Sequence, residues 1–411
     1  MKTFGSVQTF DPVQTYDLII IGAGIHGAGF SYIASAMGLK CLLIEKSPQV
    51  GSATSSNSSK LIHGGLRYLE SGQIRLVREC LKERTRLLKS APDIVTLKPF
   101  YIPIYKNSRR ANCTIALGLS VYQLLGGKNF KYLGKQEWPN FPIKQQQLTG
   151  LWQYWDCQTD DLLLTRRVIK AAQNFGCHLE LNTQPSTITL HNNHYQLNLT
   201  NSATHQNNIQ VQSRCLINAA GPWVNEVAAL HPHLPQTPIQ WVQGSHLVLN
   251  QPALDGCFYL ESPLDGRPFF VLPWHGQRLI GTTETILQNP NETKITTAEI
   301  HYLLTSYNHY FAGHTQATEH NISRTFCGSR VLPHSASSHN TNSSHTPTAI
   351  NRAHRETHLH HTPQMPGYLA LYGGKLTSFY ATAHAGMTLL MPHLNVPKSV
   401  FNHPNIQQPT F

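Results

Sequence analysis

The chain has 411 residues, 40% of them hydrophobic, which is enough for two or three domain-sized cores, and no apolar run approaches the ~20 residues that span a bilayer. The net charge of +11 favours an anionic partner, such as an acidic substrate or an anionic membrane face, and the sequence contains no recognisable nucleic-acid-binding module. The eight cysteines include no C-x-x-C pair and the N-terminus carries no secretory signal, so we expect a cytoplasmic protein with reduced thiols.

Residues 1–16 are expected to form a loosely held leader, and residues 17–46 predict a strand, a helix and a second strand. The apolar run 17–21 is typical of a buried parallel strand. Gly22, Gly24 and Gly27 follow with G-x-G-x-x-G spacing, which lets the backbone approach a pyrophosphate at a helix N-terminus. Glu45 ends the second strand, where a carboxylate bonds ribose hydroxyls. This context favours a dinucleotide site over a glycine-rich turn of some other α/β protein.

The segment that follows favours FAD over NAD. Residues 51–59 are small and rich in hydroxyl groups, too polar for a core element and suited to run beside a bound ligand. Residues 60–69 add a lysine, a histidine and a pair of glycines. A flexible serine-rich linker is the alternative, but the run is short and is flanked on both sides by predicted structure.

Residues 54–70, TSSNSSKLIHGGLRYLE, resemble the signature of FAD-dependent glycerol-3-phosphate dehydrogenases, within the D-amino-acid-oxidase-like flavoprotein superfamily. The likeness continues in the family's order at residues 160–161, 217–224, 244–248, 270–274, 281–284, 328–330 and 373–377. It implies an α/β fold with a discontinuous Rossmann-like FAD-binding domain at residues 1–98, 155–225 and 325–395. A second, α+β substrate domain on an antiparallel or mixed sheet is expected at residues 99–154 and 226–324. Residues 396–411 are expected to be a tail, without the C-terminal helical domain of longer relatives.

Two helices with unusual surfaces are predicted early in the chain. Residues 73–90 predict an amphipathic helix with apolar Ile74, Val77, Leu81 and Leu88 and a basic remainder of Arg75, Arg78, Lys82, Arg84, Arg86 and Lys89. A solvated face is the ordinary interpretation of these charges, and a phospholipid-facing helix is the alternative. The apolar run 115–125 is too short to cross a bilayer, so we expect a buried helix, with partial insertion into one leaflet as the alternative.

The rest of the chain predicts alternating strands and helices. Helices are expected at 161–174 and at 297–311, the second capped by Thr296 or Thr297. Strands are expected at 177–182, 195–200, 210–219, 240–250, 257–261, 268–273, 278–283 and 367–372. A second glycine turn at 373–375 leads into a helix expected at 376–390. The histidine-rich segment 333–363 matches no zinc-ligand spacing, so we expect a polar surface loop and no metal site.

The resemblance implies which residues contact FAD. They belong to the two glycine turns, the polar segment with the residues that follow it, and the AAG turn. The expected set is Gly22, Gly24, Gly27, Glu45, Ser52, Thr54, Ser55, Ser56, Ser59, Lys60, Leu61, His63, Gly64, Gly65, Ala220, Gly221, Gly374, Lys375, Leu376 and Thr377.

The resemblance also implies a site for a phosphorylated substrate. Arg330, Arg352 and Lys375 match the positions of the family's substrate-anchoring cations, and arginine and lysine are the side chains that bind phosphate. His246 and His63 are the candidates for a base or polarising group, with a structural role for each histidine as the alternative. We favour His246, because it would belong to the substrate domain. The expected catalytic set is therefore His246, Arg330, Lys375 and His63.

The implied activity is FAD-dependent oxidation of sn-glycerol 3-phosphate at C2 to dihydroxyacetone phosphate. Electrons would pass to a quinone, which implies a peripheral position on the cytoplasmic face of the inner membrane. Two alternatives stay open: a related oxidase or dehydrogenase of an amino acid or 2-hydroxy acid, and a degenerate flavoprotein without turnover. The second alternative is motivated by the short C-terminus and by Tyr380, which stands where relatives carry arginine.

Overall fold

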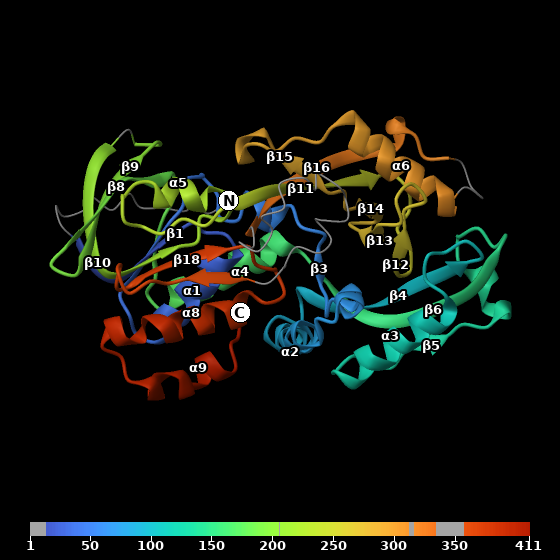
Figure 1. Cartoon of the computed structure of the whole chain (residues 1–411), viewed down its shortest axis with the longest axis horizontal. Helices are drawn as coiled ribbons and strands as arrows, with labels where there is room; N and C mark the ends of the chain where they lie inside the picture. Colours follow the sequence, from blue (N-terminus) through green and yellow to red (C-terminus); the bar gives the residue numbers. More distant parts are fainter. Residues whose placement is uncertain (1–13, 205, 312–315, 334–356) are drawn as a thin grey trace, which may run out of the picture.

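The computed structural model describes residues 14–204, 206–311, 316–333 and 357–411, and two sheets organise them (Figure 1). The first sheet has the order β17-β18-β10-β1-β2-β7, in which the five strands from β18 to β7 are mutually parallel and the edge strand β17 is antiparallel to β18. Its strands are β1 (Gln14–Ile21), β2 (Cys41–Ile44), β7 (His178–Glu180), β10 (Gln206–Asn218), β17 (His358–His360) and β18 (Tyr368–Tyr372). This is the parallel sheet that the first glycine turn predicts.

Strand β1 ends in an uninterrupted apolar run because both of its faces are covered. Leu18 and Ile20 face the layer formed by α1 (Ile25–Ala36), α4 (Asp161–Asn174) and α8 (Phe379–Leu394), whereas Ile19 and Ile21 face the core on the opposite side, beside α5 (Val224–Ala228). A strand covered on both faces can carry no polar alternation. Figure 1 shows α1, α8 and the short α9 (Pro404–Gln407) together on one side of the sheet.

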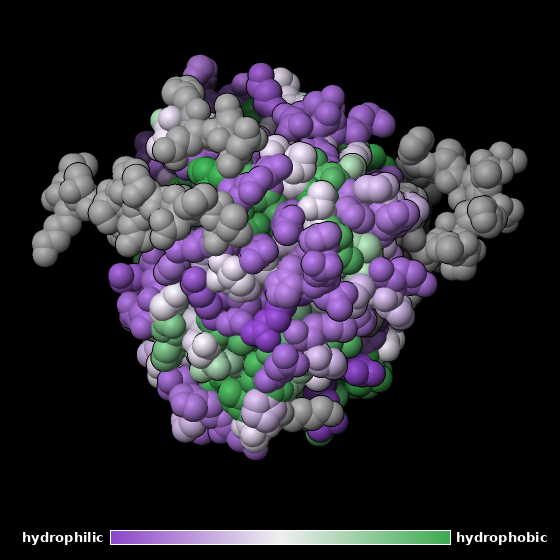
Figure 2. Space-filling view, turned by 90° about the vertical axis from the view of Figure 1, so that its left-hand side faces the viewer, coloured by the Kyte–Doolittle hydropathy of each residue, from purple (hydrophilic) through white to green (hydrophobic). Residues whose placement is uncertain are grey.

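An antiparallel ribbon extends the first sheet. Strands β8 (Thr183–His191) and β9 (His194–Asn201) pair with each other, and β9 pairs with β10. The ribbon lies at the left-hand end of the molecule in Figure 1, and Figure 2 shows that this end is largely hydrophilic, with smaller hydrophobic areas between.

The second sheet follows the order β15-β11-β14-β13-β12-β4-β6-β3, with β16 paired to β11 and β5 paired to β6. The neighbours are antiparallel except for β12 and β4. The strands are β3 (Leu61–Ile62), β4 (Val95–Tyr105), β5 (Lys131–Tyr132), β6 (Leu148–Thr159), β11 (Ile239–Leu249), β12 (Cys257–Glu261), β13 (Pro268–Trp274), β14 (Gln277–Gly281), β15 (Thr285–Leu287) and β16 (Ile322–Pro333). Helix α6 (Thr297–Phe311) packs against it. The predicted fold class, a parallel α/β unit with a mixed second sheet, is confirmed.

Short 3₁₀ turns connect these elements. They are η1 (Thr54–Ser56), η2 (Leu66–Ser71), η3 (Lys135–Asn140), η4 (Gly221–Trp223), η5 (Pro290–Glu292), η6 (Glu319–Asn321) and η7 (Lys398–Asn402). Side-chain oxygens cap two helices. Asp160 accepts a hydrogen bond from the Leu163 amide at the start of α4. Of the two cap residues considered for α6, Thr296 accepts a hydrogen bond from the Glu299 amide.

Two helices differ from their expected surfaces. In α2 (Ile74–Ser90), Arg84 is buried rather than part of the basic face, and Ile74 is exposed. Arg84 turns inward because the carboxylate of Asp156 on β6 lies 2.9 Å from its guanidinium. In α3 (Asn112–Leu124), Ile115, Leu119 and Tyr122 are buried but Leu117 and Leu124 are exposed, so the helix is half-buried instead of buried on all sides.

The C-terminal residues pack on the first sheet's helical layer. Residues 396–411, expected to be a tail, include η7 and α9, and the backbone amide of Phe411 donates to the Ser90 carbonyl. Tyr380 lies beneath them, and its hydroxyl donates to the Ile406 carbonyl at 2.6 Å. The expected boundaries also place most of β16 with the first sheet, whereas its backbone pairs along nearly its whole length with β11 of the second.

Candidate functional site

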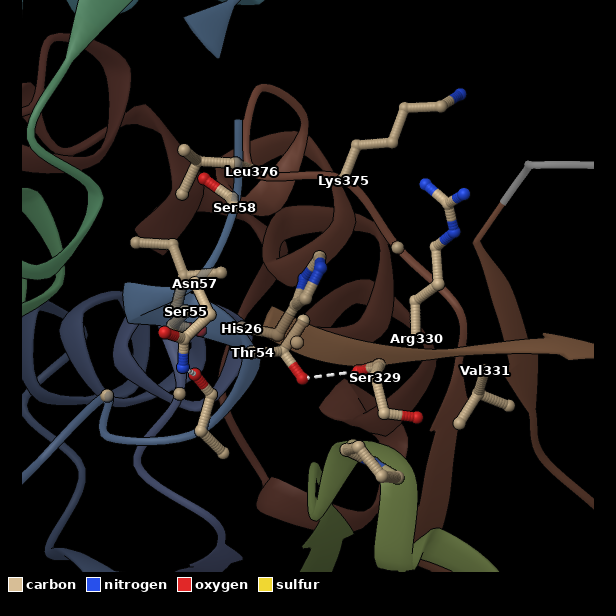
Figure 3. Close-up of a pocket in the computed structure, with 18 of the residues that line it drawn as sticks. His26, Thr54, Ser55, Asn57, Ser58, Ser329, Arg330, Val331, Lys375 and Leu376 are labelled. Carbon is tan, nitrogen blue, oxygen red and sulfur yellow. Dashed lines mark hydrogen bonds between the residues drawn. The ribbon is translucent and has the colours of Figure 1, made fainter. Parts of the chain in front are cut away.

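A cavity of about 540 Å³ lies where the carboxyl end of β1 meets the second sheet. Segments far apart in the sequence line it, including the first glycine turn, the polar segment 51–59, residues 219–223, residues 328–331 and the second glycine turn. Figure 3 shows several of these residues around the pocket, where the Thr54 hydroxyl donates to the Ser329 carbonyl at 2.6 Å. This bond ties the polar segment to β16.

The first glycine turn shapes one end of the cavity. Gly22 has a φ of +100°, and a Cβ there would lie 2.6 Å from the Ala219 carbonyl oxygen. A Cβ on Gly27 would lie 1.9 Å from the Gly22 oxygen, so this position serves the close packing of helix on strand and does not line the cavity. Gly24 and the first residues of α1 do line it, which places a helix N-terminus at the cavity wall.

Glu45 lies beside this turn, at the end of β2. Its carboxylate accepts hydrogen bonds from the backbone amides of Ala23 at 2.8 Å and Ser47 at 2.9 Å. The next residue, Lys46, places its ammonium group 3.3 Å from the ring centroid of Trp223. These groups border the part of the cavity that a ribose and its base would enter in a dinucleotide-binding fold.

Most of the expected cofactor-binding residues line the cavity. From the polar segment these are Ser52, Thr54, Ser55 and Ser59, and from the later turns they are Leu61, His63, Gly65, Ala220, Gly221, Gly374, Lys375, Leu376 and Thr377.

Three more of the expected residues lie behind the cavity wall instead. The Ser56 hydroxyl bonds the Ser52 carbonyl, and Gly64 packs against Tyr122 and Leu81. The Lys60 ammonium forms a buried ion pair with Asp161 at 2.6 Å, because an unpaired ammonium group is costly to bury.

The second glycine turn differs from its predicted form. Helix α8 begins at Phe379 rather than at Leu376, so Lys375–Thr377 form a turn along the cavity wall. The Thr377 hydroxyl accepts a hydrogen bond from the His63 amide at 3.2 Å and so holds these residues to the stretch that follows the polar segment. The turn therefore presents the Lys375 side chain, not a helix N-terminus alone, to the cavity.

Cationic and aromatic side chains gather along one part of the cavity wall. Arg330 and Lys375 lie on the same side of the pocket in Figure 3. The Lys375 ammonium is 4.7 Å from the ring centroid of Tyr68, and Arg330 pairs with the buried Glu284. Arg67 lines the cavity as well, with its guanidinium 6.0 Å from the same Tyr68 ring centroid. Arg352, the third expected anion-binding residue, lies outside the described residues.

Among the described residues, sequence reasoning overlooked Arg67, Tyr68 and His26 as cavity-lining groups. Arg67 and Tyr68 lie within residues 54–70, the segment that carries the family resemblance, so the sequence did contain a signal for them. His26 follows the second glycine of the first turn, a position where a helix start faces the ligand. Its Nδ1 atom is buried without a hydrogen-bond partner in the part of the chain that the structure describes, and burial lowers its pKa to about 4.

His246 is the most constrained of the candidate groups. Only 3% of the residue is exposed, its ring stacks on Phe326 with centroids 4.8 Å apart, and Nε2 lies 3.0 Å from the Ser59 hydroxyl. Burial, and then the charges of Lys60 and Arg330, lower its pKa to about 3. The imidazole is therefore neutral at physiological pH and keeps one nitrogen able to accept a proton.

A buried carboxylate fixes the strand that carries His246. Glu299 on α6 accepts hydrogen bonds from Ser245 at 2.9 Å, Thr283 at 2.7 Å and Gln243 at 2.8 Å. Burial acts to raise the pKa of Glu299, but these bonds, led by that from Thr283, leave it lowered. The carboxylate thus stays ionised and holds β11 and the residues after β14 in place.

The cavity fits an anionic dinucleotide by the structure's own features. The left-handed Gly22, the helix N-terminus of α1 and the unpaired Nδ1 of His26 all lie at the wall where a pyrophosphate is expected. No group of three or more metal-ligating side chains occurs within the described ranges. Fold and cavity together define an enzyme that uses a dinucleotide cofactor.

Comparisons with known proteins support this class of enzyme. The profile described as FAD dependent oxidoreductase matches residues 17–384. An aerobic glycerol-3-phosphate dehydrogenase of Staphylococcus aureus (strain MRSA252) is 33% identical over 328 residues, covering 77% of this chain and 58% of that protein. One from Escherichia coli (strain K12) is 33% identical over 386 residues, covering 93% of this chain and 74% of that protein. The chain thus spans little more than half the length of the staphylococcal relative.

The fold has a solved counterpart. The glycerol-3-phosphate dehydrogenase from Bacillus halodurans, complexed with FAD, matches with a TM-score of 0.73 at 24% identity, covering 94% of this chain and 67% of that one. The chain belongs to the FAD dependent oxidoreductase family. The predicted resemblance to FAD-dependent glycerol-3-phosphate dehydrogenases, the FAD cofactor and the assignment to FAD-dependent oxidoreductases are confirmed.

Proposed function

We propose that the protein oxidises sn-glycerol 3-phosphate at C2 to dihydroxyacetone phosphate. The observation that carries this proposal is a cluster of cations on the cavity wall: Arg330 and Lys375, with Arg67 beside Tyr68, the ring that Lys375 also contacts. Such a cluster suits a substrate whose inert end is a phosphate. The relatives named as aerobic glycerol-3-phosphate dehydrogenases support the same substrate.

The cavity-lining residues have separate roles in binding the substrate and in moving its proton. Bound FAD supplies a two-electron acceptor for the alcohol. Arg330 and Lys375 bind the phosphate, so that the C2 alcohol lies at a fixed place in the cavity. His246 accepts a hydrogen bond from the substrate hydroxyl, because its Nδ1 has no partner in the described part of the chain. Since its pKa is lowered, the ring relays the proton and does not keep it. His63 lies on the same wall as a second group that can hold the proton.

Anaerobic reduction of the bound flavin tests the substrate. Glycerol 3-phosphate should bleach the flavin, whereas glycerol should fail at the same concentration. Arg330→Ala should raise the glycerol 3-phosphate concentration for half-maximal bleaching by about 100-fold, from the loss of a charge-assisted bond. Arg324→Ala, on the exposed part of the same strand, is the matched control and should change nothing. Bleaching by an amino acid or a 2-hydroxy acid instead would refute the assignment.

We propose further that electrons pass to a quinone and that the protein binds peripherally to the cytoplasmic face of the inner membrane. Helix α2 exposes Arg75, Arg78 and Lys82, and the neighbouring α3 exposes Leu117 and Leu124. Basic groups beside exposed apolar ones suit an anionic lipid surface. No helix in the described ranges has the length and apolar character of a membrane span.

Vesicle sedimentation tests this surface. The holoenzyme should sediment with phosphatidylglycerol vesicles and not with phosphatidylcholine vesicles. A triple variant, Arg75→Gln, Arg78→Gln and Lys82→Gln, should lose most of this binding and still be bleached by substrate. Equal binding of wild type and variant would contradict the proposed membrane face, and a quinone analogue that fails to reoxidise the reduced enzyme would contradict the acceptor.

A further inference from the structure

A buried polar network lies at the cavity wall, between the second sheet and the helices α2 and α3. Its members are Arg84 of α2, Tyr122 of α3 and Asp156 of β6, each at most 2% exposed. The Arg84 guanidinium lies 2.9 Å from Asp156 Oδ1, and the Tyr122 hydroxyl donates to Asp156 Oδ2 at 2.7 Å. Asp156 lines the cavity, whereas Arg84 and Tyr122 lie behind it.

The network ends on the backbone of the residues that form the cavity wall. The Gly64 amide donates to the Tyr122 hydroxyl at 2.9 Å and to Asp156 Oδ1 at 3.2 Å. A Cβ at Gly64 would lie 2.3 Å from that hydroxyl, so the chain approaches the network as closely as a glycine permits. Gly64 stands between His63 and the Arg67–Tyr68 pair, whose side chains line the cavity.

The chemistry of the network suits a rigid anchor. A buried arginine and carboxylate are stable only when each is paired, so removing a partner is costly and the geometry is held tightly. The tyrosine provides the shorter of the two hydrogen bonds to the Gly64 amide. Burial, and then the charge of Asp156, raise the pKa of Tyr122 well above its ordinary value. Its hydroxyl therefore keeps its proton for Asp156 and offers its lone pair to the Gly64 amide.

We propose that Tyr122, held by Asp156 and Arg84, is a positioning residue for the wall segment 63–68. It fixes the Gly64 amide and thereby the places of His63, Arg67 and Tyr68 around the flavin and the substrate phosphate. The inference deepens the proposed function, because these side chains belong to the candidate substrate end of the cavity. Its effect on cofactor binding is independent of which substrate the enzyme uses.

Tyr122→Phe removes only the linking hydroxyl. Tyr195→Phe is the matched control, since Tyr195 is equally buried and donates one hydrogen bond to the Pro366 carbonyl at 2.9 Å, away from the cavity. FAD should leave the diluted Tyr122→Phe holoenzyme about fivefold faster than wild type, a change that corresponds to one ordinary hydrogen bond. The glycerol 3-phosphate concentration for half-maximal bleaching should rise by a similar factor. Tyr195→Phe should match wild type in both measurements.

Equal FAD release from wild type and Tyr122→Phe, with an unchanged flavin absorption spectrum, would overturn the proposal. If glycerol 3-phosphate bleaches neither protein, the proposed substrate fails, while FAD release still decides the positioning role. Should Tyr122→Phe not fold, hydrogen–deuterium exchange of the wild-type holoenzyme decides it. The Gly64 amide should then exchange as slowly as the amides of β6, and exchange at the rate of an exposed loop would refute the anchor.

Discussion

The Ser59 hydroxyl lies 3.0 Å from Nε2 of His246, and this contact joins the polar segment 51–59 to strand β11 of the second sheet. The bond orients the imidazole at the boundary between the two sheets. Phe326 stacks on the ring from β16, so the histidine is fixed by groups from two segments besides its own strand β11. A proton acceptor held this firmly suits a reaction that needs one defined alignment.

Ser59→Ala should therefore lower the rate of flavin reduction. Without the hydroxyl, both ring nitrogens of the buried His246 lack a partner and the ring can rotate. We expect a rate about tenfold lower, corresponding to about 1.4 kcal/mol, with a smaller change in the substrate concentration needed. Stopped-flow bleaching under anaerobic conditions measures both. Ser186→Ala, at an exposed hydroxyl that bonds the Asn198 carbonyl in the β8–β9 ribbon, is the control, and an equal loss there would discredit the role given to Ser59.

Stability should depend on His246 below neutral pH. Its pKa in the folded protein is lowered to about 3, whereas in the unfolded chain it is near the ordinary value of about 6.5. Below pH ~6.5 the unfolded chain binds a proton that the folded protein does not, so acid favours unfolding. The loss of unfolding free energy should reach about 2 kcal/mol between pH 6.5 and pH 5. The melting temperature of the FAD-saturated His246→Asn variant should fall less steeply than that of wild type as the pH is lowered over this range. The melting temperature of the control His191→Asn, changed at an exposed residue, should fall as steeply as that of wild type.

Glu284→Gln should weaken the binding of a phosphorylated substrate. Glu284 is buried and pairs with Arg330, and it also lies 3.8 Å from Arg267. When Glu284 loses its charge, the carboxylate no longer orients the Arg330 guanidinium. KM for glycerol 3-phosphate should therefore rise about tenfold, while kcat changes less. Glu284→Asp should restore part of the affinity. The exposed Glu319→Gln controls for the change in net charge. A lower KM in Glu284→Gln would mean that the carboxylate competes with the substrate phosphate for Arg330.

Tyr380→Phe should affect stability and not catalysis. The family resemblance predicts an arginine where this chain has Tyr380, but Tyr380 is buried away from the cavity and its hydroxyl donates to the Ile406 carbonyl. Removing the hydroxyl should reduce the free energy of unfolding by about 1 kcal/mol. Flavin content and the rate of bleaching by substrate should match wild type. A variant that loses bleaching would revive the interpretation of Tyr380 as a mark of a degenerate enzyme.

The sequence predicted those elements whose pattern is local. The strand 17–21, the helix 161–174 and the helix 297–311 each carry their own periodicity or capping residue, and the structure has them at or within a few residues of these bounds. The glycine turns were found in the same way, because a positive φ or a close approach leaves a glycine in the sequence.

Long-range partners could not be foreseen. Arg84 had the spacing of a surface residue, but its partner Asp156 lies 72 positions further along the chain. Lys60 directly follows the polar segment 51–59 and was predicted to bind FAD, but it forms an ion pair with Asp161, which lies 101 positions away in the sequence. Periodicity records which face a residue occupies relative to its neighbours, and it contains no information about a carboxylate delivered by a distant strand.

The cavity wall needs both the first glycine turn and residues 373–377, which lie far apart in the sequence but adjoin in the fold, since a Cβ on Gly374 would lie 2.2 Å from Nε2 of His26. During synthesis the ribosome makes the first glycine turn long before the second. FAD therefore cannot be enclosed until both turns have left the ribosome, and a cell short of riboflavin should accumulate chains that lack this stabilising ligand and are easily degraded.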